Sequence, residues 1–175
     1  MTDADETAPG ANRRERIRLE QFPEYGRWFR PGSPEERQFR LMRRIGRISR
    51  LWLARFEEEL RPLGQTQSRW EVLMFLALWG DGATQAALAK RMEIEGPSLV
   101  RLLDKLEHDG LVERVASGVD RRAKLVHLTA AGVDMVTRLT AVTNASRKRL
   151  LHGVGDREMD QAMQVLDRIL GELEG

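Results

Sequence analysis

Apolar residues recur three and four positions apart through most of the chain, which is the spacing of amphipathic helices. The longest such segment covers residues 35–60. Ser33-Pro34 suits its start, because serine caps helices and proline is tolerated in the first turn, and Pro62 and Gly64 end it. Its apolar face is predicted to consist of Phe39, Met42, Ile45, Leu51 or Trp52, and Phe56.

Five shorter helices are predicted further along the chain. Thr66, Thr84, Thr129 and Asp156 are the predicted N-caps of four of them, and the remaining helix begins at Pro97. In chain order the five helices end near residues 79, 92, 110, 151 and 173. The residues at helical spacing in the first of them are Trp70, Leu73, Met74, Ala77 and Leu78, and those of the helix after Pro97 are Leu99, Leu103 and Leu106.

The pattern changes to short β-type runs at residues 111–115 and 125–128. A polar, basic segment at 116–124 separates these runs and is predicted to form the tip of a hairpin. The predicted fold is therefore mainly α with a small β-hairpin wing. The order from residue 66 to 129 is helix, short helix, turn, helix, strand, basic loop and strand, which is the order of a winged helix-turn-helix.

Residues 1–34 form a distinct N-terminal arm. Residues 1–12 lack periodicity and are predicted to be disordered, and residues 13–20 have the pattern of a short helix. Four aromatic residues then follow within eight positions: Phe22, Tyr25, Trp28 and Phe29. Because exposing that much apolar surface is costly, two interpretations remain open: an arm packed on the body or on a partner subunit, or a lid over a ligand pocket.

Composition excludes several classes of function. The chain has no cysteine, so disulfides, thiol catalysis and thiol-based sensing are excluded. Its three histidines, His108, His127 and His152, lack the spacing of metal ligands, and we find no phosphate loop or nucleophile elbow. We expect neither an enzyme nor a cofactor or metal site. The polar, acidic N-terminus and the lack of a long apolar run predict a cytoplasmic protein with no membrane partner.

The net charge is only +2, so the distribution of basic residues matters more than their total. The N-terminal part of the second helix of a helix-turn-helix contacts DNA bases. The candidates there are Pro97, Ser98, Arg101 and Lys105, and Arg101 is the best candidate for bidentate reading of guanine. The wing candidates are Arg121, Arg122 and Lys124, with Asp120 expected to stabilise the loop by pairing with a neighbouring arginine.

Several of these residues also occur at the spacings of a known family. The stretches Ser98-Leu99-Val100-Arg101, Leu106-Glu107, Gly110-Leu111-Val112, Asp120-Arg121-Arg122 and Thr129-Ala130-Ala131-Gly132 resemble the MarR family of bacterial transcription regulators. A weaker resemblance extends over residues 35–173. The resemblance to this family implies a homodimer that binds a roughly palindromic, double-stranded DNA operator. Repression is the family's commoner mode.

The resemblance also implies a division of the chain. Residues 35–175 would form the MarR-type domain, with dimerisation helices at 35–61 and 129–175 and the winged DNA-binding lobe at 62–128. Physical reasoning independently favours a dimer, because the last helix carries an apolar stripe that needs a partner surface. The stripe consists of Met159, Met163, Leu166, Ile169 or Leu170, and Leu173.

Many members of this family release DNA when a small aromatic acid or its thioester binds between the dimer helices and the winged lobe. By that resemblance we expect a small organic effector, and our prediction is an aromatic carboxylate. Arg50 or Arg69 is the expected anchor, because an arginine turned inward pairs well with a carboxylate and Arg69 lies in the first turn of its helix, where the dipole suits an anion. The other ligand candidates are Trp52, Trp70 and His127. Two alternatives remain open: a winged-helix module that binds protein, and a DNA-binding regulator that needs no ligand.

Overall fold

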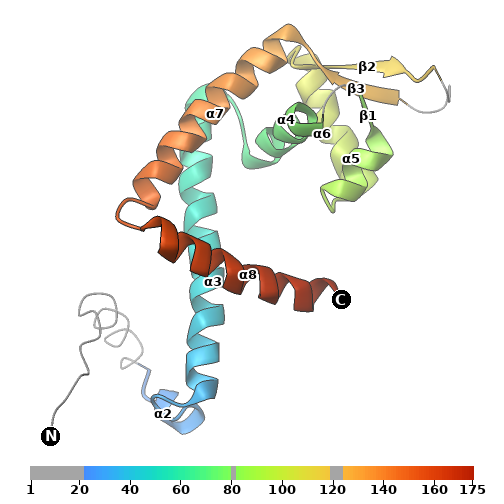
Figure 1. The fold of residues 1–175 in the computed structure, drawn as a ribbon. Coiled ribbons are helices and arrows are strands. Elements are labelled where there is room, and N and C mark those ends of the chain that lie inside the picture. The colour runs from blue at the N-terminus through green and yellow to red at the C-terminus, as the bar shows by residue number, and fades with distance from the viewer. Residues whose placement is uncertain (1–21, 80–81, 119–123) are drawn as a thin grey trace, which may run out of the picture. The chain divides into compact units, whose positions relative to one another are not determined.

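The computed structural model describes residues 22–79, 82–118 and 124–175. The chain divides into two compact units, Met1–Trp52 and Leu53–Gly175, and the long helix α3 begins in the first and ends in the second. The helices are α2 (Tyr25–Trp28), α3 (Pro34–Leu60), η1 (Arg61–Leu63), α4 (Gln67–Trp79), α5 (Gln85–Arg91), α6 (Gly96–His108), α7 (Ala130–Leu150) and α8 (Asp156–Glu174) (Figure 1). The strands are β1 (Ala83–Thr84), β2 (Val112–Ala116) and β3 (Lys124–Leu128). The fold is thus mainly α with a small sheet, as the sequence predicted.

In the first unit, the aromatic residues fold back onto the start of α3. The rings of Phe29 and Phe39 stack with centroids 4.4 Å apart, and Tyr25 lies 5.3 Å from Phe29. The buried carboxylate of Glu36 accepts hydrogen bonds from the hydroxyl of Tyr25 and the backbone N–H of Gly32. Trp28, by contrast, is 71% exposed. The described part of the arm, from residue 22 on, is therefore packed against the start of α3. The expected helix at residues 13–20 lies outside the described residues.

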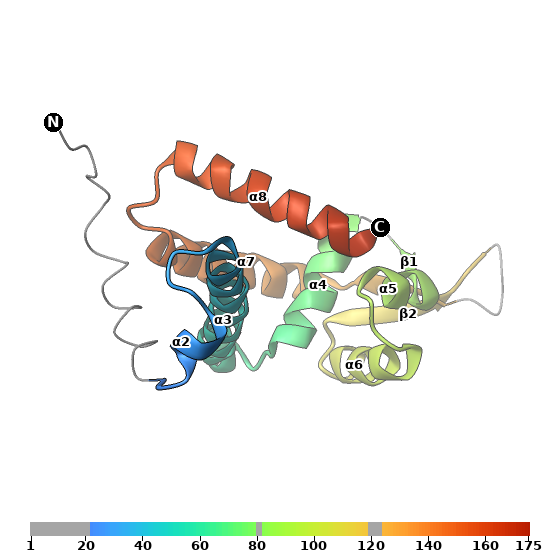
Figure 2. The ribbon, with the colours of Figure 1, turned by 90° about the horizontal axis from the view of Figure 1, so that it is seen from below.

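The second unit contains an antiparallel sheet of strand order β1-β3-β2. In the β2–β3 hairpin, Arg114 is opposite Val126 and Ala116 is opposite Lys124. The short strand β1, which the sequence did not predict, pairs Ala83 with Val126 on the other edge of β3. Figure 2 shows α5 and α6 beside this hairpin. The result is a helix-turn-helix with an attached wing.

The core of this unit is formed where the helices meet the sheet. α4 packs against α6, α7 and β3, and α6 packs against α5 and β2. The side chains that are fully buried are mainly leucines on the inner faces of the helices: Leu60, Leu73, Leu88, Leu99, Leu103, Leu106 and Leu139. Burying a side chain of this size stabilises the fold by roughly 1.5–3 kcal/mol.

The structure corrects the predicted inner face of α4. Val72, Leu73 and Leu76 are buried, whereas Ala77 is exposed and Leu78 is 80% exposed. Residues 72–79 are all apolar, so their periodicity does not select one face. The neighbouring elements α6, α7 and β3 decide which side is buried.

The start of the last helix also differs from the prediction. Gly155, rather than Asp156, is the N-cap, and its backbone N–H donates to the carboxylate of Glu158 at 2.9 Å. Asp156 lies in the first turn, where a negative charge interacts favourably with the helix dipole. The predicted caps Thr84 and Thr129 are confirmed, since each hydroxyl accepts a backbone N–H of its helix.

Candidate nucleic-acid interface and a neighbouring pocket

Helix α6 separates its apolar and polar residues sharply. Leu99, Leu103 and Leu106 are at most 1% exposed. On the other side, the DNA-binding candidates Pro97, Ser98, Arg101 and Lys105 are all exposed. Proline in the first turn sacrifices no helical hydrogen bond, so the N-terminus of α6 can form at Gly96-Pro97. The helix is anchored by one face and presents a polar, cationic face to solvent.

The turn between α5 and α6 has a defined backbone conformation. Glu93 adopts a left-handed conformation with φ of 54°, and the backbone N–H of Ile94 donates to the carbonyl of Ala89 at 3.1 Å. The chain therefore reverses direction sharply between α5 and α6. The exposed residues Lys90 and Arg91 lie in the last turn of α5, where positive charge suits the helix dipole.

The wing begins and ends within the described residues, but its tip does not lie among them. Lys124 starts β3 and is exposed. The predicted wing residues Asp120, Arg121 and Arg122 fall outside the described residues. The hairpin register fixes the two ends of this loop, because Ala116 and Lys124 are opposite each other.

Arg114 of β2 contacts two carboxylates of α6. Its Nη2 lies 2.7 Å from Oδ1 of Asp104, and its Nε donates to Oε2 of Glu107 at 3.0 Å. These bonds raise the pKa of the Arg114 guanidinium and, from the other side, lower the pKa of the Glu107 carboxyl. Both groups are therefore charged at neutral pH. Arg114 was not among the residues predicted from the sequence. Its signal was the spacing: Arg114 lies two strand positions after the buried Val112, which places both on one face of β2, and Asp104 and Glu107 lie three positions apart on α6.

A second group of contacts joins the end of α6 to the start of α7. The Thr129 hydroxyl donates to the carbonyl of Gly110 at 2.6 Å and accepts the N–H of Gly132 at 3.0 Å. The N–H of Thr129 donates to the carbonyl of Leu111 at 3.1 Å. The first turn of α7 is thus bonded directly to the segment between α6 and β2.

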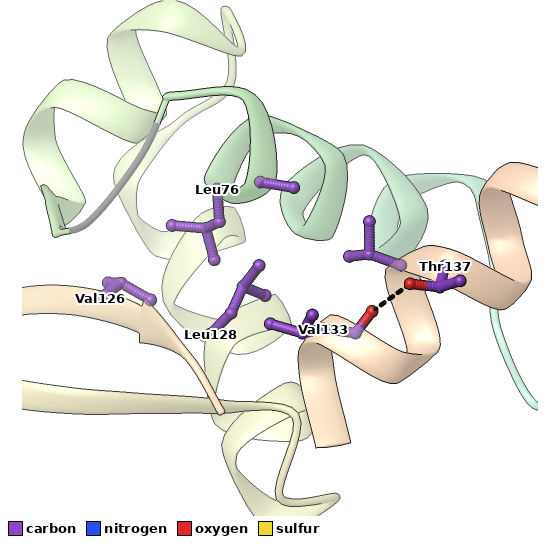
Figure 3. Close-up of a pocket in the computed structure, with 7 residues that line it drawn as sticks. Leu76, Val126, Leu128, Val133 and Thr137 are labelled. Atoms are coloured by element: carbon purple, nitrogen blue, oxygen red, sulfur yellow. Dashed lines mark hydrogen bonds between the residues drawn. The ribbon is translucent and has the colours of Figure 1, made fainter. Parts of the chain in front are cut away.

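A pocket of about 340 Å³ lies between α4, β3 and α7. Figure 3 shows Leu76, Val126, Leu128 and Val133 directed into it. The complete lining is Leu76, Ala77, Val126, Leu128, Val133, Val136 and Thr137. The Thr137 hydroxyl is engaged with the carbonyl of Val133 at 3.0 Å. The walls carry no charged side chain, so this pocket is suited to an apolar or aromatic group.

The five residues expected to bind a ligand do not line this pocket. Arg69 of α4 is paired with Asp109 at 2.5 Å, and Trp70 packs edge-on against Phe56 with centroids 4.9 Å apart. The ring of His127 on β3 lies against the backbone of Gly82. The structure therefore directs these three side chains of the second unit to different neighbours.

The other two candidates lie on the part of α3 that belongs to the first unit, where Arg50 is exposed and Trp52 is half-buried. Within the described ranges, no group of three histidine or acidic side chains is arranged to hold a metal ion. None of the described helices is both long and apolar enough to cross a bilayer.

Helix-turn-helix, hairpin wing and exposed cationic helix face together define the class of winged-helix transcription regulators. The comparisons with known proteins agree. The profile of the MarR family matches residues 63–123. The transcriptional regulator PA3341 is 40% identical, with a TM-score of 0.68, over 77% of this chain and 98% of its own. A MarR-family regulator from Silicibacter pomeroyi is 30% identical, with a TM-score of 0.62, over 73% of this chain and 86% of its own.

The chain belongs to the MarR family and is a DNA-binding transcription regulator, not an enzyme. A third similar structure is CouR from Rhodococcus jostii RHA1, which was solved bound to p-coumaroyl-CoA. It is 28% identical, with a TM-score of 0.64, and the alignment covers 71% of this chain and 87% of CouR.

Proposed function

We propose that this protein is a homodimeric repressor that leaves a palindromic operator when a small aromatic acid or its thioester binds. The observation that carries the proposal is the face of α6 on which Ser98, Arg101 and Lys105 are exposed while the opposite leucines are fully buried. A helix held in this way can enter the major groove without losing its own packing. In this proposal residues 62–128 are the DNA-binding lobe of a domain at 35–175, and the regulator acts in the cytoplasm.

In the operator complex, Arg101 would read a guanine through its two donor nitrogens, and Ser98 and Lys105 would contact base edges or phosphates. Pro97 lies at the N-terminus of the same helix. Arg121, Arg122 and Lys124 of the wing would approach the adjacent minor groove, with Asp120 shaping the loop. The two α6 helices of a dimer would occupy successive major grooves.

The dimer is supported by apolar surface that this chain leaves uncovered. None of the residues of α8 is buried, and Met163, Leu166, Leu170 and Leu173 are 41–75% exposed along one stripe. Apolar stripes of this extent indicate a partner surface. Residues 35–61 and 129–175 are the proposed dimerisation segments, and a second copy of the chain is the proposed partner.

The effector proposal is supported by the apolar pocket between α4, β3 and α7 and by the thioester bound to CouR. An aromatic ring fits a cavity without charged walls, so the acid or thioester part would extend outside it. Arg69, which lies in the same unit as the pocket, would then anchor the carboxylate and would have to exchange Asp109 for the ligand. Trp70 and His127, which belong to the same unit, would contact the ligand beyond the pocket.

Ligand and operator would oppose each other through the wing. The pocket is bounded by β3, which belongs to the wing, and by α7, which is part of the proposed dimerisation segment 129–175. A ligand that fits one separation of these elements better than another shifts the equilibrium by that difference in affinity. Coupling of this kind is typically about 1–3 kcal/mol, or roughly 5–150-fold in DNA affinity.

The decisive experiment measures binding to a labelled duplex from the region upstream of the protein's own coding sequence, by fluorescence anisotropy. Wild type should bind, and Arg101→Ala should lose about 1–3 kcal/mol of binding and accept substitutions at one base pair of each half-site. The matched control is Arg168→Ala, which removes the same charge from the polar face of α8. An Arg101→Ala variant that selects the same operator with the same strength contradicts the proposal.

A further inference from the structure

The contacts of Arg114 join the wing to the helix that we propose to enter the major groove. Its side chain is only 14% exposed, and it reaches two carboxylates that lie on successive turns of α6. One guanidinium therefore fixes both the distance and the rotation of α6 relative to β2. A lysine would fix this geometry less well, because its ammonium is a compact charge without the planar, rigid arrangement of the guanidinium donors.

The same contacts neutralise the negative charges that α6 carries. Asp104 and Glu107 are paired with Arg114, and Asp109, directly after the helix, is paired with Arg69 of α4. Among the described residues no carboxylate is paired with Arg101 or Lys105. The two acidic residues of α6 and the one directly after it are thus matched by arginines from other elements, which leaves Arg101 and Lys105 available to a ligand.

Arg101 and Asp104 lie three positions apart on α6, where helical neighbours interact. Asp104 remains 56% exposed, so it can turn toward Arg101 if its present partner is removed. An ion pair with Asp104 would compete directly with the bases for the guanidinium of Arg101. Unpaired Asp104 and Glu107 would also repel the phosphates of DNA.

We propose that Arg114 is a positioning residue for DNA recognition: it holds α6 against the wing and, by binding Asp104 and Glu107, keeps Arg101 free to read a base. The inference rests on the proposed DNA-binding role of α6. It goes further in assigning the specificity of Arg101 to a residue of β2 that is only 14% exposed and contacts α6 through its carboxylates.

The test compares wild type, Arg114→Met, Arg114→Lys and the double variant Arg114→Met/Asp104→Asn. Two measurements are made on each protein: affinity for the upstream duplex at several salt concentrations, and selection of binding sites from a randomised DNA library. Arg168→Met on α8 is the control for the loss of one positive charge. Circular dichroism establishes that each variant is folded.

Arg114→Met should bind on the order of 30-fold more weakly, which corresponds to a charged pair left without its partner. It should also lose the base preference that Arg101→Ala loses. The double variant should recover that preference, because Asp104 no longer competes for Arg101. It should recover only part of the affinity, because Glu107 remains unpaired and Arg114 no longer joins α6 to β2. Arg114→Lys should lie between wild type and Arg114→Met.

A purely structural role predicts a different result, namely weaker binding to all sequences with an unchanged preferred motif and no recovery in the double variant. That result, or wild-type affinity in Arg114→Met, overturns the inference. If Arg114→Met does not fold, Arg114→Lys with and without Asp104→Asn provides the same comparison. If the wild type itself binds no DNA, the proposed function is overturned. This outcome differs from failure of the inference, in which the wild type binds DNA and only the comparison of the Arg114 variants gives another result.

Discussion

Gly132 in the first turn of α7 lies so close to the backbone of Leu111 that a β-carbon on it would come within 2.0 Å of the Leu111 carbonyl oxygen. That same carbonyl accepts the N–H of Thr129. The absence of a side chain at Gly132 therefore allows α7 to begin directly against the segment that follows the DNA-binding helix. The glycine of the Thr129-Ala130-Ala131-Gly132 motif has a packing role that its helical position alone would not reveal.

Replacing Gly132 with alanine should destabilise the protein by about 3 kcal/mol or more, because the obstacle is backbone and cannot rotate away. The free energy of unfolding from urea titration measures the effect. Gly171→Ala in α8 is the matched control, since nothing lies within 4 Å of its added β-carbon. That variant should be as stable as wild type or more stable by up to about 1 kcal/mol, because alanine favours helix. Equal effects of the two substitutions would contradict the packing role of Gly132.

Arg122→Ala should weaken binding to the upstream duplex similarly for all sequences, because a wing arginine in the minor groove acts mainly through charge. The slope of log affinity against log salt concentration should fall by about 1. Arg101→Ala should instead change the selected sequence. Unchanged affinity and slope in Arg122→Ala would remove this residue from the DNA interface.

Placing glutamates at Leu166 and Leu170 of α8 should convert the protein to monomers, because both side chains belong to the exposed apolar stripe. Burying unpaired charges in a subunit interface is strongly unfavourable. Light scattering coupled to size-exclusion chromatography measures the molar mass. Glu172→Ala on the same helix should leave it unchanged. Dimers that persist in the double variant would place the subunit interface elsewhere.

Ala77→Trp should abolish the response to aromatic acids while leaving operator binding intact. Ala77 is exposed and lines the apolar pocket, so an indole at this position occupies the space proposed for the ligand ring. Isothermal titration with p-coumarate and its thioester, followed by operator-release assays, measures both properties. Leu78→Trp, one residue along and outside the pocket lining, is the control. An effector that still binds Ala77→Trp with wild-type affinity does not use this pocket.

The pair between Glu107 and Arg114 should give the stability a measurable pH dependence. The hydrogen bonds from Arg114 lower the pKa of the Glu107 carboxyl below its usual 4.5. A carboxyl whose pKa is lowered by folding stabilises the folded state above its unfolded pKa, and this contribution is lost as the pH falls through the folded value. Wild type should therefore exceed Glu107→Gln in stability near neutral pH, and the difference should shrink below about pH 4.

The size of that difference should be below about 1 kcal/mol, because the side chain is partly exposed and solvent screens the pair. Urea denaturation at a series of pH values measures it. The control is Glu113→Gln, an exposed position on the same strand. A difference for Glu107→Gln that stays constant down to low pH would show that the pair does not contribute through its charge.

Local signals in the sequence predicted the order of the elements. The Ser33-Pro34 start of α3, the threonine caps of α5 and α7 and the change to β-type runs after Gly110 all act over a few residues, so no tertiary knowledge is needed to recognise them. The alternation of leucines in α6 likewise identified its buried face, and with it the exposed position of Arg101.

The ligand candidates show the limit of such reasoning. Arg69 and Trp70 were selected for their chemistry, but their contacts, Asp109 and Phe56, lie 40 and 14 positions away in the chain. The apolar pocket is formed instead by residues of α4, β3 and α7 that have no chemical signature individually. Its existence depends on how three elements pack.

The sequence by itself determined the class of fold, the helix that carries the cationic face and the family, because periodicity, caps and motif spacings are properties of neighbouring residues. Only the tertiary structure decided which face of α4 is buried, that Arg114 binds Asp104 and Glu107, and that Gly132 touches Leu111. Those relationships join segments that are distant along the chain. They follow from the packing of side chains between elements, which no local pattern encodes.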